Sequence, residues 1–195
     1  MLGLKLPTDP RWARVAKENL PELLTDHAWC EQKAASNAIS LMVSYPEYPR
    51  LVEQMVQIAQ EELIHFAQVH ERILQRGWQL GRERKDEYVN EIAAFMKKGG
   101  NRVDNLVERL LFAALIEARS CERFRVLSEY LADKDSELAA FYHDLMASEA
   151  DHYTVFLGFA RQVGGREKVD ARWREFLAYE GELIQRYGQR ETMHG

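Results

Sequence analysis

Two Glu-x-x-His triplets are the residues of this 195-residue chain best suited to chemistry. Glu62 and His65 form the first triplet, and Glu149 and His152 form the second. On an α-helix, residues three positions apart are separated by about 60° around the axis and rise about 4.5 Å. The carboxylate and the imidazole of each triplet can therefore reach the same metal ion.

A lone glutamate precedes each triplet at a similar distance along the chain. Glu31 lies 31 positions before Glu62, and Glu117 lies 32 positions before Glu149. The two lone glutamates are 86 positions apart, and the two triplets are 87 positions apart. One half of the chain is therefore laid out like the other, which indicates two equivalent sets of ligands.

Four carboxylates and two imidazoles in this order can hold two metal ions inside a four-helix bundle. Carboxylates bridge neighbouring ions, and two-metal sites have ions about 3.5–4 Å apart. A ligand set of oxygen and nitrogen favours iron or manganese, whereas thiolate-rich zinc ligation does not fit it. The predicted metal ligands are Glu31, Glu62, His65, Glu117, Glu149 and His152.

Hydrophobic periodicity predicts the helices that position these ligands. Four long helices are expected, with their ligands on otherwise apolar stripes, over residues 21–43, 50–76, 103–131 and 137–163. A short turn joins the first helix to the second, and another joins the third to the fourth. A long crossover over residues 77–102 connects these two helix pairs. The prediction is an all-α fold: a ferritin-like four-helix bundle with one long crossover and additional short helices, forming a single domain over residues 1–195. Those short helices are a stretch opening at Asp9-Pro10, one within the crossover over about 84–98 and a C-terminal helix over about 170–187.

A Glu-x-x-His triplet alone is a weak signal, because Glu191 and His194 form a third one near the C-terminus. We interpret that third triplet as a coincidence. For the other two, the alternative to metal ligation is a set of scattered buried ion pairs. Buried carboxylates without partners are costly, so four of them on core stripes favour a common cation site.

Several residues near the predicted ligands have two interpretations. His27, one turn before Glu31, is either a hydrogen-bonded core histidine or an additional ligand. Cys30 and Cys121 are either small packing residues or thiols near the metals. Tyr153 follows a ligand directly and is either a radical site or a packing residue. Packing in the core or at its rim is the preferred interpretation, because adjacent helical residues point about 100° apart.

Length and composition narrow the class of protein. The chain carries a formal charge of −5, which two divalent cations in the predicted site would largely offset. Its apolar runs are too short to cross a bilayer, and residues 1–12 do not resemble a secretion signal. Two cysteines are too few for a disulfide framework. We expect a cytoplasmic protein with no membrane association; the sequence makes no prediction of the oligomeric state.

Around the predicted ligands, the sequence resembles the ferritin-like di-iron carboxylate proteins. It is more closely similar to the tRNA hydroxylases that act on 2-methylthio-N6-isopentenyladenosine, and the resemblance extends over most of the chain. It is carried by the stretches Ala28–Ala34, Glu61–Phe66, Ile116–Phe124 and Ser148–Tyr153, with no departure at the ligand positions.

The resemblance implies a non-haem di-iron monooxygenase with two iron ions (Fe2+/Fe3+) and O2 as co-substrate. Its substrate would be the modified adenosine next to the anticodon of tRNA. One oxygen atom would enter a C–H bond of the isopentenyl group, and the other would leave as water. Two electrons per turnover would come from an external donor, a reductase that the sequence does not identify.

The charge pattern gives modest independent support for an RNA partner. From Arg72 to Arg109 there are nine basic and six acidic residues, a local excess of +3 in an acidic protein. Phosphate contacts require such a local excess, although a solvated helix surface explains it equally well. The candidate tRNA contacts are Arg84, Lys85, Lys97, Lys98, Arg102, Arg119 and Arg123.

Two other functional classes fit the repeated ligand sets. The first is a ferritin-like iron-oxidising, storage or sensing protein, and the second is a metal-free helical scaffold that binds protein or RNA. The repeated half-sites alone do not separate these alternatives from the hydroxylase.

Overall fold

A computed structural model describes residues 2–187 and 192–194, and every regular element among them is an α-helix. This confirms the predicted all-α class. The helices, in chain order, are α1 (Pro10–Glu18), α2 (Leu20–Ser44), α3 (Pro49–Gln75), α4 (Glu87–Phe95), α5 (Arg102–Leu131), α6 (Ser136–Gly164) and α7 (Arg166–Leu183).

The four long helices end within one residue of the predicted bounds, because local signals define their ends. A proline occupies the first turn of both α2 and α3, where the missing N–H costs nothing. The side chain of Asn101 accepts from the Asp104 N–H at the start of α5, and Asp135 does the same for Leu138 at the start of α6. These caps satisfy backbone donors that would otherwise lack partners.

Two short helices differ from the prediction. The helix within the crossover is shorter than expected, since Asp86 caps it by accepting from the Val89 N–H. The C-terminal helix begins at residue 166 rather than at about 170, and it ends at residue 183. Gly165 has a φ of 82°, so the chain turns sharply after α6 and α7 starts without a linker.

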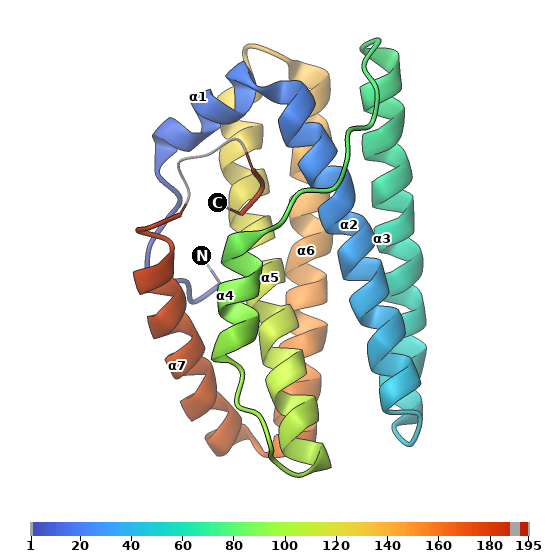
Figure 1. Cartoon of the computed structure of the whole chain (residues 1–195), viewed down its shortest axis with the longest axis vertical. Helices are drawn as coiled ribbons and strands as arrows, with labels where there is room; N and C mark the ends of the chain where they lie inside the picture. The colour runs from blue at the N-terminus through green and yellow to red at the C-terminus, as the bar shows by residue number, and fades with distance from the viewer. Residues whose placement is uncertain (1, 188–191, 195) are drawn as a thin grey trace. The chain divides into compact units, whose positions relative to one another are not determined.

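The chain divides into two compact units. Of the described residues, the first unit comprises 2–14, 86–187 and 194, and the second comprises 15–85, 192 and 193. In the second unit, α2 and α3 pack along their length and are joined by a four-residue connection, which makes them antiparallel (Figure 1). Their apolar side chains alternate with the acidic and imidazole side chains predicted as ligands, so this hairpin positions one half of the ligand set.

In the first unit, α5 and α6 form the corresponding hairpin (Figure 1). Helix α7 packs on both of them, and α4 contacts α5 and α7. The ring of Phe95 on α4 stacks on Tyr179 of α7 at a centroid distance of 4.2 Å. The short helices therefore cover the second hairpin, which positions the other half of the ligand set.

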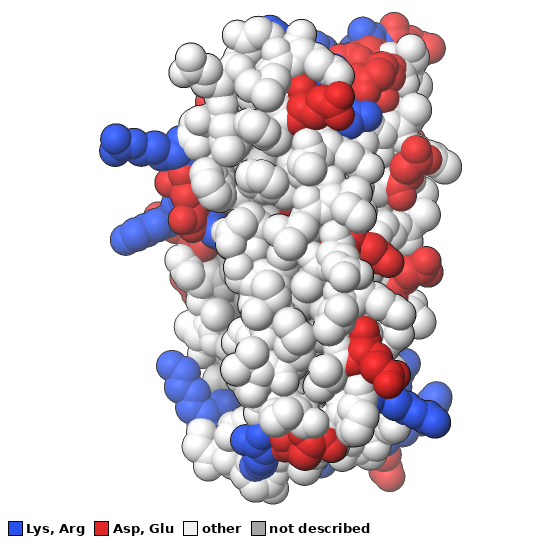
Figure 2. Space-filling view, turned by 90° about the vertical axis from the view of Figure 1, so that its right-hand side faces the viewer, with Lys and Arg blue, Asp and Glu red and all other residues white. Residues whose placement is uncertain are grey.

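The surface is uneven in charge. Figure 2 shows the face that includes α3: uncharged atoms cover much of its middle, and both acidic and basic side chains lie toward its edges. None of the described helices combines the length and the apolar composition that a membrane crossing requires.

Candidate metal centre

One half of the predicted ligand set lies in the second unit. Helix α2 supplies Glu31, and α3 supplies Glu62 and His65 from successive turns. The Nδ1 atom of His65 lies 3.4 Å from Oε2 of Glu62 and 3.6 Å from Oε2 of Glu31. All three residues are buried, with at most 8% of their surface exposed. Their nitrogen and oxygen donors therefore converge on one small volume.

His27 supports this half-site from one turn earlier on α2. Its Nε2 atom lies 2.6 Å from Oε1 of Glu31, and the residue is fully buried. The interpretation of His27 as a hydrogen-bonded core histidine is confirmed, and its partner is a predicted ligand. Such a contact fixes the orientation of the carboxylate, as residues around metal ligands commonly do.

The charges of this half-site call for a cation. Burial by itself would raise the pKa of Glu31, yet the hydrogen bond with His27 and the nearby imidazole of His65 hold that pKa well below its usual value. Burial alone would lower the pKa of His65, but the carboxylates of Glu31 and Glu62 raise it to about 10. The carboxylates thus hold a proton on His65 at neutral pH. A divalent cation would take the place of that proton.

The other half of the ligand set lies in the first unit. Helix α5 supplies Glu117, and α6 supplies Glu149 and His152. One donor atom from each lies within 4.8 Å of the others. All three residues are buried, with at most 5% of their surface exposed. This half-site repeats the first in composition, with two carboxylates and one imidazole.

The donor set fits iron or manganese, because it consists of carboxylate oxygen and imidazole nitrogen. Cys121 does not add a thiolate: burial raises the pKa of its thiol to about 11, and Sγ donates to the carbonyl of Met146. Its interpretation as a packing residue is confirmed. Cys30 is only half-buried. Tyr153 packs at the edge of the core, with its ring 6.0 Å from that of Trp173.

Comparisons with known proteins identify the family of this chain. A family model described as tRNA-(MS2IO6A)-hydroxylase (MiaE) matches residues 2–195. A tRNA 2-(methylsulfanyl)-N(6)-isopentenyladenosine(37) hydroxylase from Pseudomonas putida is 38% identical, over 98% of this chain and 91% of the relative. A protein of the same name from Salmonella typhimurium is 32% identical, over 93% of this chain and 83% of the relative.

The chain belongs to the MiaE tRNA hydroxylase family. Among solved structures, a Synechococcus protein with aldehyde deformylating oxygenase activity matches with a TM-score of 0.90 and 34% identity, over 98% of this chain and 95% of that chain. The resemblance inferred from the sequence is therefore confirmed, as is the ferritin-like fold class. The half-sites described above are those of a MiaE family member with a close structural relative among the oxygenases.

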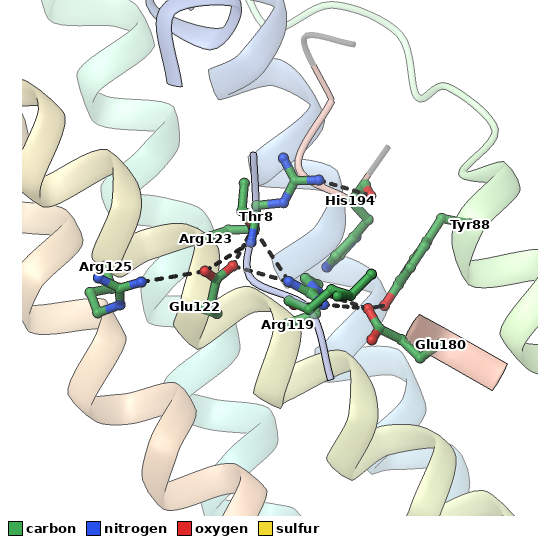
Figure 3. A network of polar contacts seen from close by, with 9 residues as sticks. Thr8, Tyr88, Arg119, Glu122, Arg123, Arg125, Glu180 and His194 are labelled. Carbon is green, nitrogen blue, oxygen red and sulfur yellow. Dashed lines mark hydrogen bonds and ion pairs between the residues drawn. The ribbon is translucent and has the colours of Figure 1, made fainter. Parts of the chain in front are cut away.

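Two of the arginines predicted to contact tRNA are inside this MiaE family member. Arg119 is fully buried: its Nη2 atom donates to Oε1 of Glu180 at 2.6 Å, and Nη1 donates to Oε2 of Glu122 at 3.1 Å (Figure 3). Arg123 is also fully buried, and it lies over the ring of Trp12 with 4.0 Å to the ring centroid. The prediction that they contact tRNA is wrong, because neither guanidinium reaches the surface.

Glu122 belongs to the same cluster, and only 2% of its surface is exposed. It accepts hydrogen bonds from Thr8 and Arg119, and it pairs with Arg125 (Figure 3). The phenol of Tyr88 on α4 donates to Glu180, which joins a third helix to the cluster. We call Thr8, Tyr88, Arg119, Glu122 and Glu180 the buried ion-pair cluster.

Only His194 of the third Glu-x-x-His triplet can be described, because Glu191 lies outside the described residues. His194 is not part of the repeated ligand pattern. Its Nδ1 lies 2.9 Å from Oδ2 of Asp86, its Nε2 lies 3.1 Å from Oγ of Ser120, and its ring stacks on Tyr88. These contacts hold His194 within the first unit.

The remaining candidate tRNA contacts stay predictions. Lys85, Lys97, Lys98 and Arg102 are exposed, and Arg84 is half-buried. The ammonium of Lys97 pairs with Glu175 at 3.3 Å. Because these positions lie at or near the surface, they keep the accessibility that a phosphate contact requires.

Proposed function

We propose that this chain is an O2-dependent di-iron hydroxylase of the isopentenyl side chain of 2-methylthio-N6-isopentenyladenosine, next to the anticodon in tRNA. The observation that carries this proposal is the family match over residues 2–195. Two relatives named for this reaction support it, as does the pair of half-sites with equal donor sets.

We also propose that the two half-sites act together in one domain and hold two iron ions. Glu31, Glu62 and His65 would serve mainly one ion, and Glu117, Glu149 and His152 the other. The repeated spacing of the ligands supports this pairing. The likeness to an oxygenase over nearly the whole chain supports it as well. In the ferritin-like di-iron proteins, such residues all project into the bundle core.

When bound, the iron pair would supply the redox chemistry that activates O2 for insertion of one oxygen atom into a C–H bond. The second oxygen atom leaves as water, so each turnover consumes two electrons and two protons from outside the substrate. The electron donor would be an external reductase. The chain's own residues provide the ligand charge, with His27 holding the Glu31 carboxylate at 2.6 Å. Buried apolar neighbours, such as Ala28 on α2 and Ala113 on α5, would exclude water from the site.

One alternative activity has a specific observation in its favour. The Synechococcus relative is described by aldehyde deformylating oxygenase activity and is 34% identical to this chain. The same ligand set would serve both reactions, so the ligands do not separate them. The difference lies in the substrate: a tRNA nucleoside for one activity and an aldehyde that loses its formyl group for the other.

The test is nucleoside analysis of tRNA incubated with reduced, iron-loaded protein and isotopically labelled O2. We expect the isopentenylated nucleoside to gain one labelled oxygen atom, and we expect no product when iron is omitted. A parallel reaction with a long-chain aldehyde should give no formyl loss. Unchanged nucleoside together with aldehyde turnover would favour the alternative activity. Bound iron by the hundreds in a large assembly, with neither product, would instead favour iron storage.

A further inference from the structure

A row of three aromatic rings lies on the second unit, outside the ligand set. The rings of Trp29 on α2 and Phe66 on α3 have centroids 6.0 Å apart, and Phe66 stacks on His70 at 6.1 Å with 19° between the ring planes. All three side chains are half-buried rather than enclosed. On α3 the row is flanked by Leu63 and Leu74, which are 49% and 55% exposed. We call Trp29, Phe66 and His70 the ring row.

The start of the crossover is attached beside this row. The indole Nε1 of Trp29 donates to the carbonyl of Gly81 at 3.0 Å, and the N–H of Gly81 donates to Oγ1 of Thr25 at 3.3 Å. A Cβ atom at Gly81 would lie only 3.1 Å from Cγ2 of Thr25, so glycine allows this close approach. Three residues after Gly81, the backbone carbonyl of Arg84 accepts a hydrogen bond from Nζ of Lys33 at 3.4 Å. These bonds hold residues 81–84 against α2, next to the ring row.

The attached segment carries uncompensated positive charge. Within residues 82–85, the one acidic side chain, Glu83, pairs with Lys33 at 3.0 Å. Arg82 and Lys85 are exposed, and in the described part of the chain no carboxylate pairs with either of them. We call residues 82–85 the basic segment. The surface therefore combines partly exposed ring faces with adjacent cations.

We propose that the ring row and the basic segment form a docking surface for single-stranded RNA, namely the anticodon loop of the tRNA substrate; this inference rests on the proposed function. Unpaired bases stack on aromatic side chains whatever their identity, and lysine and arginine neutralise the phosphates that connect them. Neither feature alone makes such a surface. Their attachment to each other through Trp29 and Gly81 places both in reach of one strand.

Uncharged atoms cover much of the face that Figure 2 shows, and acidic as well as basic side chains lie toward its edges. In the proposed complex, bases would lie over the ring row, and the backbone phosphates would face Arg82 and Lys85 of the basic segment. A second copy of this chain is the alternative partner for the exposed side chains of Leu63 and Leu74. Binding of a second copy would leave the basic segment without a role.

The test measures the affinity of the iron-loaded protein for a fluorescently labelled anticodon stem–loop RNA that lacks the modification. His70→Ala should weaken binding about tenfold, as expected for loss of one base-stacking ring. His70→Phe keeps a ring and should restore the affinity. His143→Ala is the matched control, because His143 is an exposed histidine on α6 outside the proposed surface, and its affinity should be unchanged.

A second pair of variants addresses the basic segment. The affinity falls as the salt concentration rises. In the double variant Arg82→Gln, Lys85→Gln, the plot of log affinity against log salt concentration should be less steep by about 1.4, the value for two phosphate contacts to a single strand. Lys134→Gln, an exposed lysine on the turn after α5, is the control and should leave the slope unchanged. Bound iron is measured in every variant, so that a disturbed metal site or fold is recognised.

The outcomes are separable from those of the proposed function. The unmodified RNA is not hydroxylated, so its binding does not depend on the reaction assignment. The proposal is overturned if the His70 and basic-segment variants bind the RNA as tightly as the parent protein does. Concentration-dependent self-association that is lost in a Leu63→Ser, Leu74→Ser variant, with unchanged RNA affinity, would assign the surface to a second copy and also overturn it.

Discussion

Two clusters of buried carboxylates in this protein balance their charge in different ways. In the buried ion-pair cluster, Arg119 lies between Glu122 and Glu180, with N···O distances of 3.1 and 2.6 Å. In the half-site of α2 and α3, imidazole nitrogens of His27 and His65 lie 2.6 and 3.6 Å from carboxylate oxygens of Glu31. The first cluster contains its own permanent cation, whereas the second contains groups that are cationic only when protonated.

The difference separates a cluster that is electrostatically complete from a half-site that can accept a cation. Removing two carboxylates from water is costly unless positive charge accompanies them into the interior. Guanidinium stays charged at every accessible pH, so the cluster around Arg119 is complete within the chain. An imidazole gives up its proton to bind a metal, so the half-site can exchange its proton for a divalent cation.

The largest expected effect comes from removing a carboxylate of the ligand set. Glu62→Gln should lower hydroxylase activity by more than about 100-fold and reduce the bound iron, because it removes a ligand charge at the metal. The metal-free form should unfold at the same or a higher denaturant concentration, since one buried negative charge is gone. Iron analysis and urea unfolding with and without iron check both statements. Glu61→Gln, an exposed neighbour on α3, is the matched control. Normal iron content in Glu62→Gln would contradict the assignment of Glu62 as a ligand.

The corresponding change in the buried ion-pair cluster should behave differently. Glu180→Gln leaves Arg119 with one buried carboxylate partner instead of two, so it should cost about 3–5 kcal/mol of unfolding free energy. The loss should be the same in metal-free and iron-loaded protein. Urea unfolding of both forms measures it, and Glu182→Gln, an exposed position on α7, serves as the control. A loss confined to the iron-loaded form would mean that this cluster acts through the metal site.

The pH dependence of the metal-free protein should reveal the proton on His65. The pKa of His65 is about 10 in the folded chain, above the ordinary value of 6.5. Its stabilising contribution is therefore fully present below about pH 6.5 and is lost as the pH rises toward 10. We expect the unfolding free energy to fall over this range, and the fall to be smaller in His65→Gln. Ferrous loading at neutral pH should release a proton, which a weakly buffered titration detects. No proton release would contradict the exchange of proton for cation.

The smallest effect is expected at an exposed ion pair. The side chains of Lys168 and Asp104 are 71% and 35% exposed, although the two charges lie only 2.6 Å apart. Lys168→Gln should leave the unfolding free energy almost unchanged, because water screens the pair. The same urea experiment measures it. A loss as large as that of Glu180→Gln would show that burial does not govern the strength of these pairs.

The long helices and the convergence of Glu62 with His65 could be predicted from the sequence because their signals are local. Glu62 and His65 lie within one turn, and the caps at Asn101 and Asp135 bond three residues onward. The start of α7 could not be predicted in this way. Gly164-Gly165 indicates a helix end, but the left-handed φ of Gly165 that lets α7 follow at once is a property of the folded backbone.

The buried ion-pair cluster was missed for a different reason. The main partner of Arg119 is Glu180, 61 positions away, and Tyr88 lies 92 positions from Glu180. Without knowledge of such a distant partner, a charged residue on α5 is interpreted as a solvated surface residue. The sequence gives only a weak signal of burial: Arg119 and Glu122 lie on the same helix as the predicted ligand Glu117. Only the tertiary packing shows that the two charges are paired in the interior.

The most direct test of the central claim is the number of ferrous ions that bind tightly to each chain under anaerobic conditions. The proposal predicts two for the parent protein, with fewer in both Glu62→Gln and Glu149→Gln, because each change removes a ligand from one of the repeated half-sites. Binding of no ferrous ion by the parent protein, or of two by both variants, would contradict a di-iron centre built from these six residues.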